Sequence, residues 1–185
     1  GDEIIFTSGG TESNNLAVVG FVEGLQKKGI PYNKMHALTS VIEHPSVLDC
    51  FKELQKRGVD VGYIGVNNKG LIEISAVKKA LKENTVLVSF MYVNNEIGTI
   101  QPIRQIAHII TQAQKENKFQ IPQCAFTIPF FHTDASQAPL YLNCNVDRLG
   151  VDLLTIDGQK LYGPKGVGLL YKKRGTPLSQ LFYGK

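Results

Sequence analysis

The sequence VDLLTIDGQKLYGPKGVG, residues 151–168, decides the fold class. It begins with an apolar run over residues 151–156, continues with a loop rich in Gly and Pro around Lys160, and leads into a second apolar run over residues 167–171. Apolar runs bounded by Gly and Pro are typical of buried strands. An amine at the end of such a strand, partly shielded from water, is suited to attack on a carbonyl group. Lys160 is therefore a candidate catalytic residue, and a solvated loop cation is the alternative.

The composition indicates an ordinary globular chain. Its 185 residues, 43% hydrophobic and 19% charged, suffice for one domain with a full core. The net charge of +4 comes from basic residues spread along the chain, so we expect no nucleic-acid binding. No apolar run is long enough to span a bilayer, and residues 1–3 do not resemble a signal peptide, so we expect no membrane association.

The three cysteines point to a reducing compartment. Cys50, Cys124 and Cys144 have no C-x-x-C spacing and leave one cysteine unpaired in any disulfide scheme. Such a pattern argues against a zinc site and favours a cytoplasmic protein. We predict no metal centre.

Both ends of the sequence suggest a longer chain. Residue 1 is Gly rather than Met, residues 3–7 already have the pattern of a strand, and residues 181–185 complete no element. We therefore expect residues 1–185 to be one large domain that is truncated at both ends.

Strand-like and helix-like segments alternate along the chain. The expected strands are residues 4–6, 34–41, 59–66, 85–91, 128–133, 151–156 and 167–171. The expected helices start at residue 11 and cover residues 46–58, 74–83 and 102–113. This alternation predicts an α/β fold of three layers, with a mostly parallel sheet and helices on both faces. Residues 115–127 are polar and then irregular, and we expect them to form a surface insertion.

The first expected strand ends in glycines and a threonine that start a helix. Free N–H groups and the helix dipole attract anions at such a junction, so Gly10 and Thr11 are candidates for holding a phosphate. The pattern matches neither G-x-x-x-x-G-K-[ST] nor G-x-G-x-x-G. A simple helix cap by Thr11 is the alternative.

The histidines differ in their expected positions. His44 and His132 are expected at strand ends, His36 within a strand and His108 within a helix. His44 comes directly before a helix, so a helix cap or a loop hydrogen bond is the alternative to a role in a site.

Other polar residues follow the later strands. Asn95 follows the fourth strand, and Asp134 and Gln137 follow the fifth. Turn formation is the alternative for Asn95, and a helix N-cap is the alternative for Asp134. Because ligands bind at the carboxyl ends of parallel strands, we expect these side chains to share one rim with Lys160.

Pyridoxal phosphate (PLP) needs an amine, a carboxylate for its ring nitrogen and N–H donors for its phosphate, and it profits from a stacked ring and from a donor to its phenolic oxygen. The segments TSGGTESNN, EHPSVL, VNNEIGTIQPI, HTDASQ and GQKLYGPKGVG follow one another in the sequence. Together they resemble the motifs of the class V aminotransferase group of fold-type I PLP enzymes. The cysteine desulfurases are the most similar members, followed by the selenocysteine lyases. The resemblance covers nearly the whole chain.

The resemblance implies roles for the candidate residues. Lys160 would bind PLP covalently and move protons at the substrate α-carbon, Asp134 would pair with the pyridine nitrogen, and His44 would stack on the ring and assist proton transfer. The remaining cofactor positions correspond to Asn95 and Gln137 near the phenolic oxygen, and to Gly10, Thr11, Asp157 and Gln159 near the phosphate.

The implied reaction removes sulfur from L-cysteine to give L-alanine and a persulfide on an enzyme cysteine. The resemblance also implies a homodimer, and a sulfur acceptor such as an iron–sulfur cluster scaffold or a tRNA-modifying protein.

The sequence departs from the family directly before the lysine. Family members carry Ser-Gly-His there, and this chain has Asp157-Gly158-Gln159. Gln159 can still donate a hydrogen bond to phosphate, but an ionised Asp157 close to the phosphate would repel it.

Two further departures concern other parts of the family pattern. Residues 115–127 are longer than the corresponding loop usually is. The family's persulfide cysteine, its substrate-carboxylate arginine and the phosphate-binding threonine lent by the partner subunit would lie beyond residue 185. Cys50, Cys124 and Cys144 match none of them.

Three interpretations follow. The chain is the large domain of a cysteine desulfurase whose isolated 185 residues are inactive, or the large domain of a selenocysteine lyase or another class V aminotransferase. The third is a non-catalytic domain that has lost PLP, which the residues Asp157 and Gln159 favour.

Overall fold

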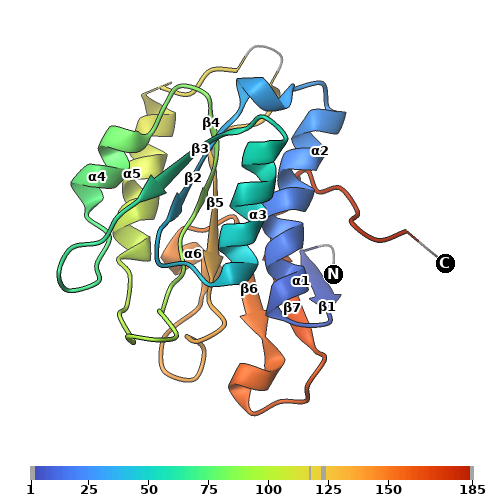
Figure 1. Ribbon diagram of the computed structural model, residues 1–185, viewed down its shortest axis with the longest axis vertical. Helices are drawn as coiled ribbons and strands as arrows, with labels where there is room; N and C mark the ends of the chain where they lie inside the picture. The colour runs from blue at the N-terminus through green and yellow to red at the C-terminus, as the bar shows by residue number, and fades with distance from the viewer. Residues whose placement is uncertain (1–2, 117, 122–123, 184–185) are drawn as a thin grey trace.

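The computed structural model describes residues 3–116, 118–121 and 124–183, and these form one seven-stranded sheet flanked by helices (Figure 1). The strands are β1 (Ile4–Thr7), β2 (His36–Ser40), β3 (Asp60–Ile64), β4 (Thr85–Ser89), β5 (Phe130–Asp134), β6 (Leu153–Asp157) and β7 (Gly168–Lys172). The helices are α1 (Gly10–Asn15), α2 (Phe21–Lys27), α3 (Pro45–Lys56), α4 (Ile74–Ala80), α5 (Ile103–Lys115) and α6 (Val146–Leu149). Shorter helical segments are η1 (Leu16–Gly20), η2 (Tyr32–Lys34) and η3 (Gly158–Leu161).

The sheet is mostly parallel. Its strand order is β1-β7-β6-β5-β4-β2-β3, and β2, β3, β4, β5 and β6 run parallel to their neighbours in that series. Strand β7 is antiparallel to both β1 and β6. The predicted α/β class with a mostly parallel sheet is therefore confirmed.

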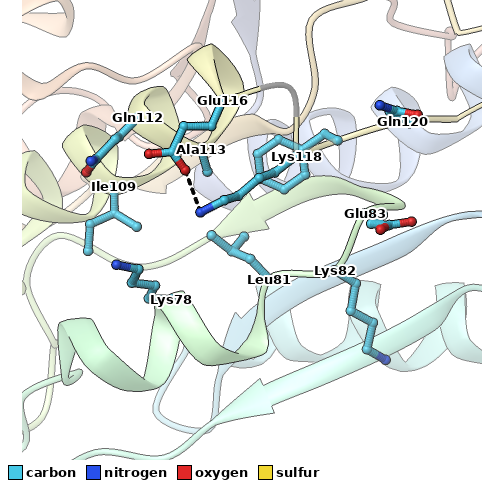
Figure 2. Close-up of a pocket in the computed structure, with 11 residues that line it drawn as sticks. Lys78, Leu81, Lys82, Glu83, Ile109, Gln112, Ala113, Glu116, Lys118 and Gln120 are labelled. Atoms are coloured by element: carbon cyan, nitrogen blue, oxygen red, sulfur yellow. Dashed lines mark ion pairs between the residues drawn. The ribbon is translucent and has the colours of Figure 1, made fainter.

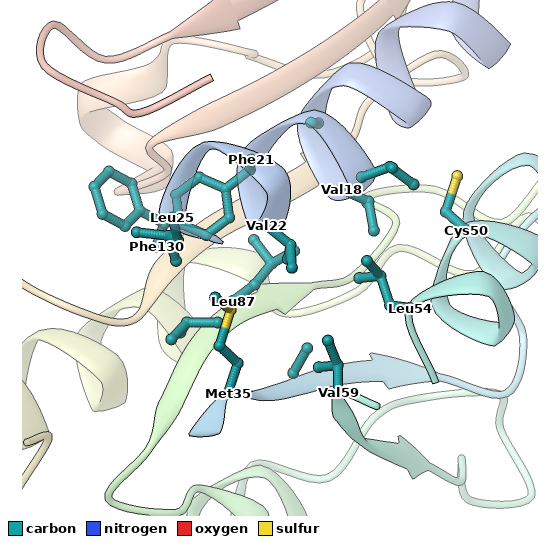
Figure 3. Packing of buried hydrophobic residues seen from close by; sticks show 14 of the residues in the cluster. Val18, Phe21, Val22, Leu25, Met35, Cys50, Leu54, Val59, Leu87 and Phe130 are labelled. Carbon is teal, nitrogen blue, oxygen red and sulfur yellow. The ribbon is translucent and has the colours of Figure 1, made fainter. Parts of the chain in front are cut away.

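Two hydrophobic cores lie on the two faces of the sheet. Because side chains alternate along a strand, Phe130 and Leu153 enter the first core and their neighbours Phe131 and Leu154 enter the second. Helices α2 and α3 cover the first core, part of which Figure 3 shows, and α4 and α5 cover the second. Helices on both faces give the three layers that the sequence predicts.

The helix expected from residue 11, with Leu16, Val19 and Leu25 on its apolar face, is confirmed. It begins at Gly10, and α1, η1 and α2 continue without a break to Lys27. The middle segment, η1, is π-helical, and its buried Ala17, Val18 and Val19 belong to the first core.

Two segments differ in detail from what the sequence predicts. His132 lies inside β5 and not at a strand end, because the strand continues to Asp134. The described part of residues 115–127 lies mostly at the surface as expected, but Ile121 is buried in the first core and Phe119 and Phe126 pack against it. Residues 117, 122 and 123 of that segment lie outside the described part. Among the helices of the described residues, none is both long and apolar enough to cross a bilayer.

Candidate active site

The carboxyl ends of several strands and the start of α1 meet at one cavity of about 90 Å³. The predicted site residues that line it are Gly10, Thr11, His44, Asn95, Asp134, Gln137, Asp157 and Lys160. Gln159 is the predicted residue that does not line it. Residues far apart in the sequence thus come together at the rim that the parallel sheet predicts.

The start of α1 is open towards this cavity. Gly9 is the N-cap residue, and no side chain of the described residues caps the helix, so the alternative of a Thr11 cap is wrong. The backbone N and Oγ of Ser8 both donate to Glu12 Oε2, at 2.7 and 2.6 Å, and these bonds lower the pKa of Glu12. The first N–H groups of the helix keep the positive dipole end free for an anion.

Asp134 is fixed at the end of β5 by two donors. Its Oδ1 accepts from the backbone N of Ser136 at 2.9 Å, and its Oδ2 accepts from Asn14 Nδ2 at 2.8 Å. The side chain is 8% exposed. Hydrogen bonds to both oxygens fix the orientation of this carboxylate.

His44 both caps α3 and lines the cavity. Its Nδ1 accepts from the backbone N of Ser46 at 3.2 Å and lies 2.8 Å from Ser46 Oγ. The alternative of a helix cap is therefore correct, because the His44 side chain accepts from a backbone N–H of α3. The residue also lines the same cavity as Lys160.

Lys160 stands in η3, directly after β6. It is exposed, and within the described part of the chain it makes no hydrogen bond or ion pair. The backbone around it is constrained, because Gly158 N donates to Val167 O at 2.8 Å and Gly163 N donates to Gly158 O at 3.0 Å. A Cβ at Gly158 would lie 2.7 Å from Val167 O, so this position requires glycine. The loop thus holds a free amine at the cavity.

Asp157 and Gln159 interact with each other. Asp157 accepts from the backbone N of Gln159 at 3.2 Å and from its Nε2 at 3.3 Å. The Asp157 carboxylate also lies against the start of α1, since a Cβ at Gly10 would be 3.3 Å from its Oδ2. The amide of Gln159 is therefore directed to Asp157, and the Asp157 carboxyl group lies at the expected phosphate position.

The two asparagines after β4 have different environments. Asn94 is buried, donates to Ile42 O at 3.0 Å and accepts from the backbone N of Glu96 and Ile97 at 2.9 Å. Asn95 is exposed and lines the cavity. Turn formation thus describes Asn94, and Asn95 is available to a ligand.

Sequence reasoning missed several residues of the cavity, namely Asn14, Ser46, Met91, Val93 and Ser136. Asn14 had a usable signal, because asparagine is a poor helix former and this one lies inside a helix. Its amide donates to Asp134 and, at 2.9 Å, to Ser46 Oγ. Ser46 had no comparable signal, because serine is common in the first turn of a helix.

Glu43 is a buried carboxyl group beside His44. Its Oε1 accepts from Ser40 Oγ at 2.5 Å and from Met91 N at 3.0 Å, and its Oε2 has no partner within the described structure. Burial raises the pKa of Glu43 to about 8, against the opposing effect of those hydrogen bonds. A protonated carboxyl group therefore stands next to the site at neutral pH.

None of the cysteines lines the cavity. Cys50 is buried in α3, where burial raises the pKa of its thiol to about 12. Burial also raises the pKa of Cys144, which lies in an irregular segment like Cys124. Within the described residues, no group of three or more His, Cys, Asp or Glu could hold a metal ion.

A larger cavity, of about 400 Å³, lies between the ends of α4 and α5 and the residues after α5 (Figure 2). It is near the amino end of β4 and contains none of the predicted site residues. Three of its charged residues are in ion pairs, since Lys118 pairs with Glu116 at 2.6 Å and Lys82 pairs with Asp60. Volume does not identify the active site, because this cavity and two others, of about 1100 and 680 Å³, are all larger than the one at the strand ends. The convergent amine, carboxylate and imidazole favour the smaller cavity as the candidate active site.

Comparisons with known proteins identify the family of the chain. The sequence matches the family model described as aminotransferase class-V over residues 1–184. It is 44% identical over 183 residues to a cysteine desulfurase IscS of Dictyoglomus turgidum, covering 99% of this chain and 42% of that protein. It is 44% identical over 172 residues to a mitosomal cysteine desulfurase of Trachipleistophora hominis, covering 93% of this chain and 35% of that protein.

Solved structures show the same fold. A NifS-like protein matches with a TM-score of 0.85 at 34% identity, over 99% of this chain and 46% of that one. SspA in complex with cysteine matches with a TM-score of 0.82 at 37% identity, over 98% of this chain and 48% of that one. The chain thus spans less than half the length of these relatives.

Proposed function

Because the chain belongs to the class-V aminotransferase family, we propose that it is the large, cofactor-binding domain of a PLP-dependent cysteine desulfurase. The observation that carries the proposal is the convergence of Lys160, Asp134 and His44 on one cavity at the carboxyl ends of the strands. The relatives that are named cysteine desulfurases and the neighbour with bound cysteine support L-cysteine as the substrate.

The residues of the cavity fit PLP. Lys160 offers a primary amine for its aldehyde, Asp134 a carboxylate for its ring nitrogen, and the start of α1 offers N–H groups for its phosphate. When bound, PLP withdraws electrons from the bonds at the substrate α-carbon.

Each side chain then has a defined task. Lys160 would hold the aldehyde group of the cofactor through its Nζ and would carry a proton to and from the substrate α-carbon. Asp134, held by Asn14 and Ser136, would keep the ring nitrogen protonated. His44 would pack against the ring and assist proton transfer. Asn95 and Gln137 would offer their amides to the phenolic oxygen.

The products of the proposed reaction are L-alanine and a persulfide. A cysteine of the complete protein accepts the sulfur, because Cys50, Cys124 and Cys144 lie outside the cavity. We therefore expect the 185 residues alone to bind PLP and to show no desulfurase turnover.

The proposal includes a setting for the complete protein. Residues 1–185 form its large domain, since the relatives are more than twice as long. The complete protein is a homodimer that passes sulfur to an acceptor protein. The three free cysteines support a reducing compartment, which we take to be the cytoplasm.

Asp157 favours a second candidate, a domain that no longer binds PLP. Its carboxylate lies at the start of α1 and engages the amide of Gln159. The Gln159 amide is then unavailable to a phosphate, and an ionised Asp157 carboxylate repels the phosphate.

A titration with PLP distinguishes these candidates. We expect the 185-residue chain to develop a visible absorption band with PLP, Lys160→Ala to lose it, and Lys165→Ala, the control in the same exposed loop, to keep it. A folded wild-type sample without a band would support the second candidate, and a band that survives in Lys160→Ala would contradict the assignment of the lysine.

A further inference from the structure

A chain of hydrogen bonds connects the imidazole of His44 to the carboxylate of Asp134. Asn14, from α1, donates through Nδ2 to Asp134 Oδ2 at 2.8 Å and to Ser46 Oγ at 2.9 Å. Ser46 Oγ lies 2.8 Å from His44 Nδ1. Helix α1, the start of α3 and the end of β5 are thus joined at the wall of one cavity.

The direction of these bonds follows from the donor count. The Asp134 carboxylate only accepts, so the amide nitrogen of Asn14 must face it. Both amide hydrogens of Asn14 are then used, one on Asp134 and one on Ser46 Oγ. Ser46 Oγ accepts from Asn14, and its own hydrogen is directed to His44 Nδ1.

Two donors consequently point at the same ring nitrogen. The backbone N of Ser46 also donates to His44 Nδ1, at 3.2 Å. A nitrogen that accepts two hydrogen bonds carries no proton, so a neutral His44 has its hydrogen on Nε2.

Asn14 donates these two hydrogen bonds although its own amide oxygen accepts none within the described structure. The residue is 1% exposed, and its Oδ1 has no partner within the described structure. A buried polar atom without a partner destabilises a fold, and an apolar side chain would avoid that cost. Its two donated bonds are a reason for asparagine at this position.

We propose that Asn14 and Ser46 are positioning residues that hold His44 in its Nε2-protonated tautomer and couple its ring to the Asp134 carboxylate. The proposal deepens the proposed function, on which it rests, by assigning these two residues to the same site. His44 then exchanges protons through Nε2, because Nδ1 is occupied by Ser46.

Nitrogen NMR of the histidine rings tests the proposal on the 185-residue chain without PLP. The spectra are recorded at alkaline pH, where free imidazole is neutral, and the nitrogen shifts report which ring nitrogen carries the hydrogen. We expect the Nε2-protonated form to dominate in the wild type. In Ser46→Ala the ratio of the two tautomers should fall by about fivefold, which is what one hydrogen bond of about average strength contributes.

Matched variants separate positioning from a general loss of structure. Ser46→Thr retains the hydroxyl and should restore the wild-type ratio, whereas Asn14→Ala should shift it in the same direction as Ser46→Ala. Asn15→Ala is the control, because Asn15 bonds to Thr11 O within its own helix. The rings of His36 and His132, which bond to Thr85 and to Ser89 and Thr155, report folding in every sample.

The outcomes are distinct. An Nδ1-protonated His44 in the wild type, or an unchanged ratio in both Ser46→Ala and Asn14→Ala with the other histidines intact, would overturn the proposal. The expected tautomer shift in a chain that shows no PLP band would support the positioning role and overturn the proposed function instead.

Discussion

Asp157 brings a carboxylate to the start of α1, where the sequence predicts a phosphate site. It lies close to Gly10 and accepts two hydrogen bonds from Gln159. An ionised carboxylate at this place repels a phosphate and offsets part of the attraction of the helix dipole. The affinity for PLP therefore depends on this side chain.

We expect Asp157→Ser to lower the dissociation constant of PLP by about tenfold, which corresponds to the removal of about 1.4 kcal/mol of repulsion. A fluorescence titration of the 185-residue chain measures this constant. Asp147→Ser is the control, since Asp147 lies in α6, outside the cavity. Equal affinities of wild type and Asp157→Ser would show that the carboxylate does not face the phosphate.

Glu43 makes the free energy of unfolding depend on pH. Burial raises its pKa in the folded chain to about 8, from a reference value of 4.5. The folded state keeps the proton over this range while the unfolded state releases it. The contribution of Glu43 to the free energy of unfolding is therefore fully present below pH 4.5 and is lost as the pH rises towards about 8.

Glu43→Gln removes this loss, because an amide does not titrate. Urea denaturation at a series of pH values should show that the stability of the variant relative to wild type rises by up to about 1.4 kcal/mol per pH unit between these limits. Burial lowers the pKa values of His36 and His132 to about 4, so these residues also make stability depend on pH. Their contributions are the same in both proteins and cancel when the free energy of unfolding of wild type is subtracted from that of Glu43→Gln at each pH. A constant difference across the range would mean that Glu43 is ionised in the fold.

At the scale of elements, β7 approaches the start of α1 very closely. A Cβ at Gly168 would lie 2.6 Å from Gly9 Cα and 2.7 Å from its carbonyl carbon. Both neighbours are backbone atoms, so a side chain at residue 168 must displace the first turn of α1. The glycine therefore serves the position of the helix as well as the strand.

Gly168→Ala should destabilise the chain by about 1–3 kcal/mol and weaken PLP binding, because the displaced helix start would lose its place at the cavity. Thermal denaturation and a PLP titration measure the two effects. Gly65→Ala provides the comparison, since nothing lies within 4 Å of a Cβ there. If both variants behave alike, the close approach does not position α1.

At the scale of the whole molecule, the sequence predicted what depends on local patterns. Apolar runs and turn residues indicated every strand to within about two residues. The parallel sheet then implied a common rim, and the structure brings Lys160, His44 and Asp134 together there. The roles of these residues stay predictions.

What the sequence did not reveal depends on contacts between distant segments. Asn14 and Asp134 are 120 residues apart, so no local pattern shows their hydrogen bond. The buried environment of Glu43 includes Met91, 48 residues away, whose backbone N donates to its Oε1. The contacts of Phe119 and Ile121 with the first core were hidden because a polar stretch precedes them.

The most direct test of the account is to locate the covalent attachment of PLP. The 185-residue chain is incubated with PLP, reduced with borohydride, digested and analysed by mass spectrometry, so that every lysine of the chain competes for the label. The account predicts one modified peptide, with the pyridoxyl group on Lys160. Label distributed over other lysines, or absent from Lys160 in folded protein, would contradict it.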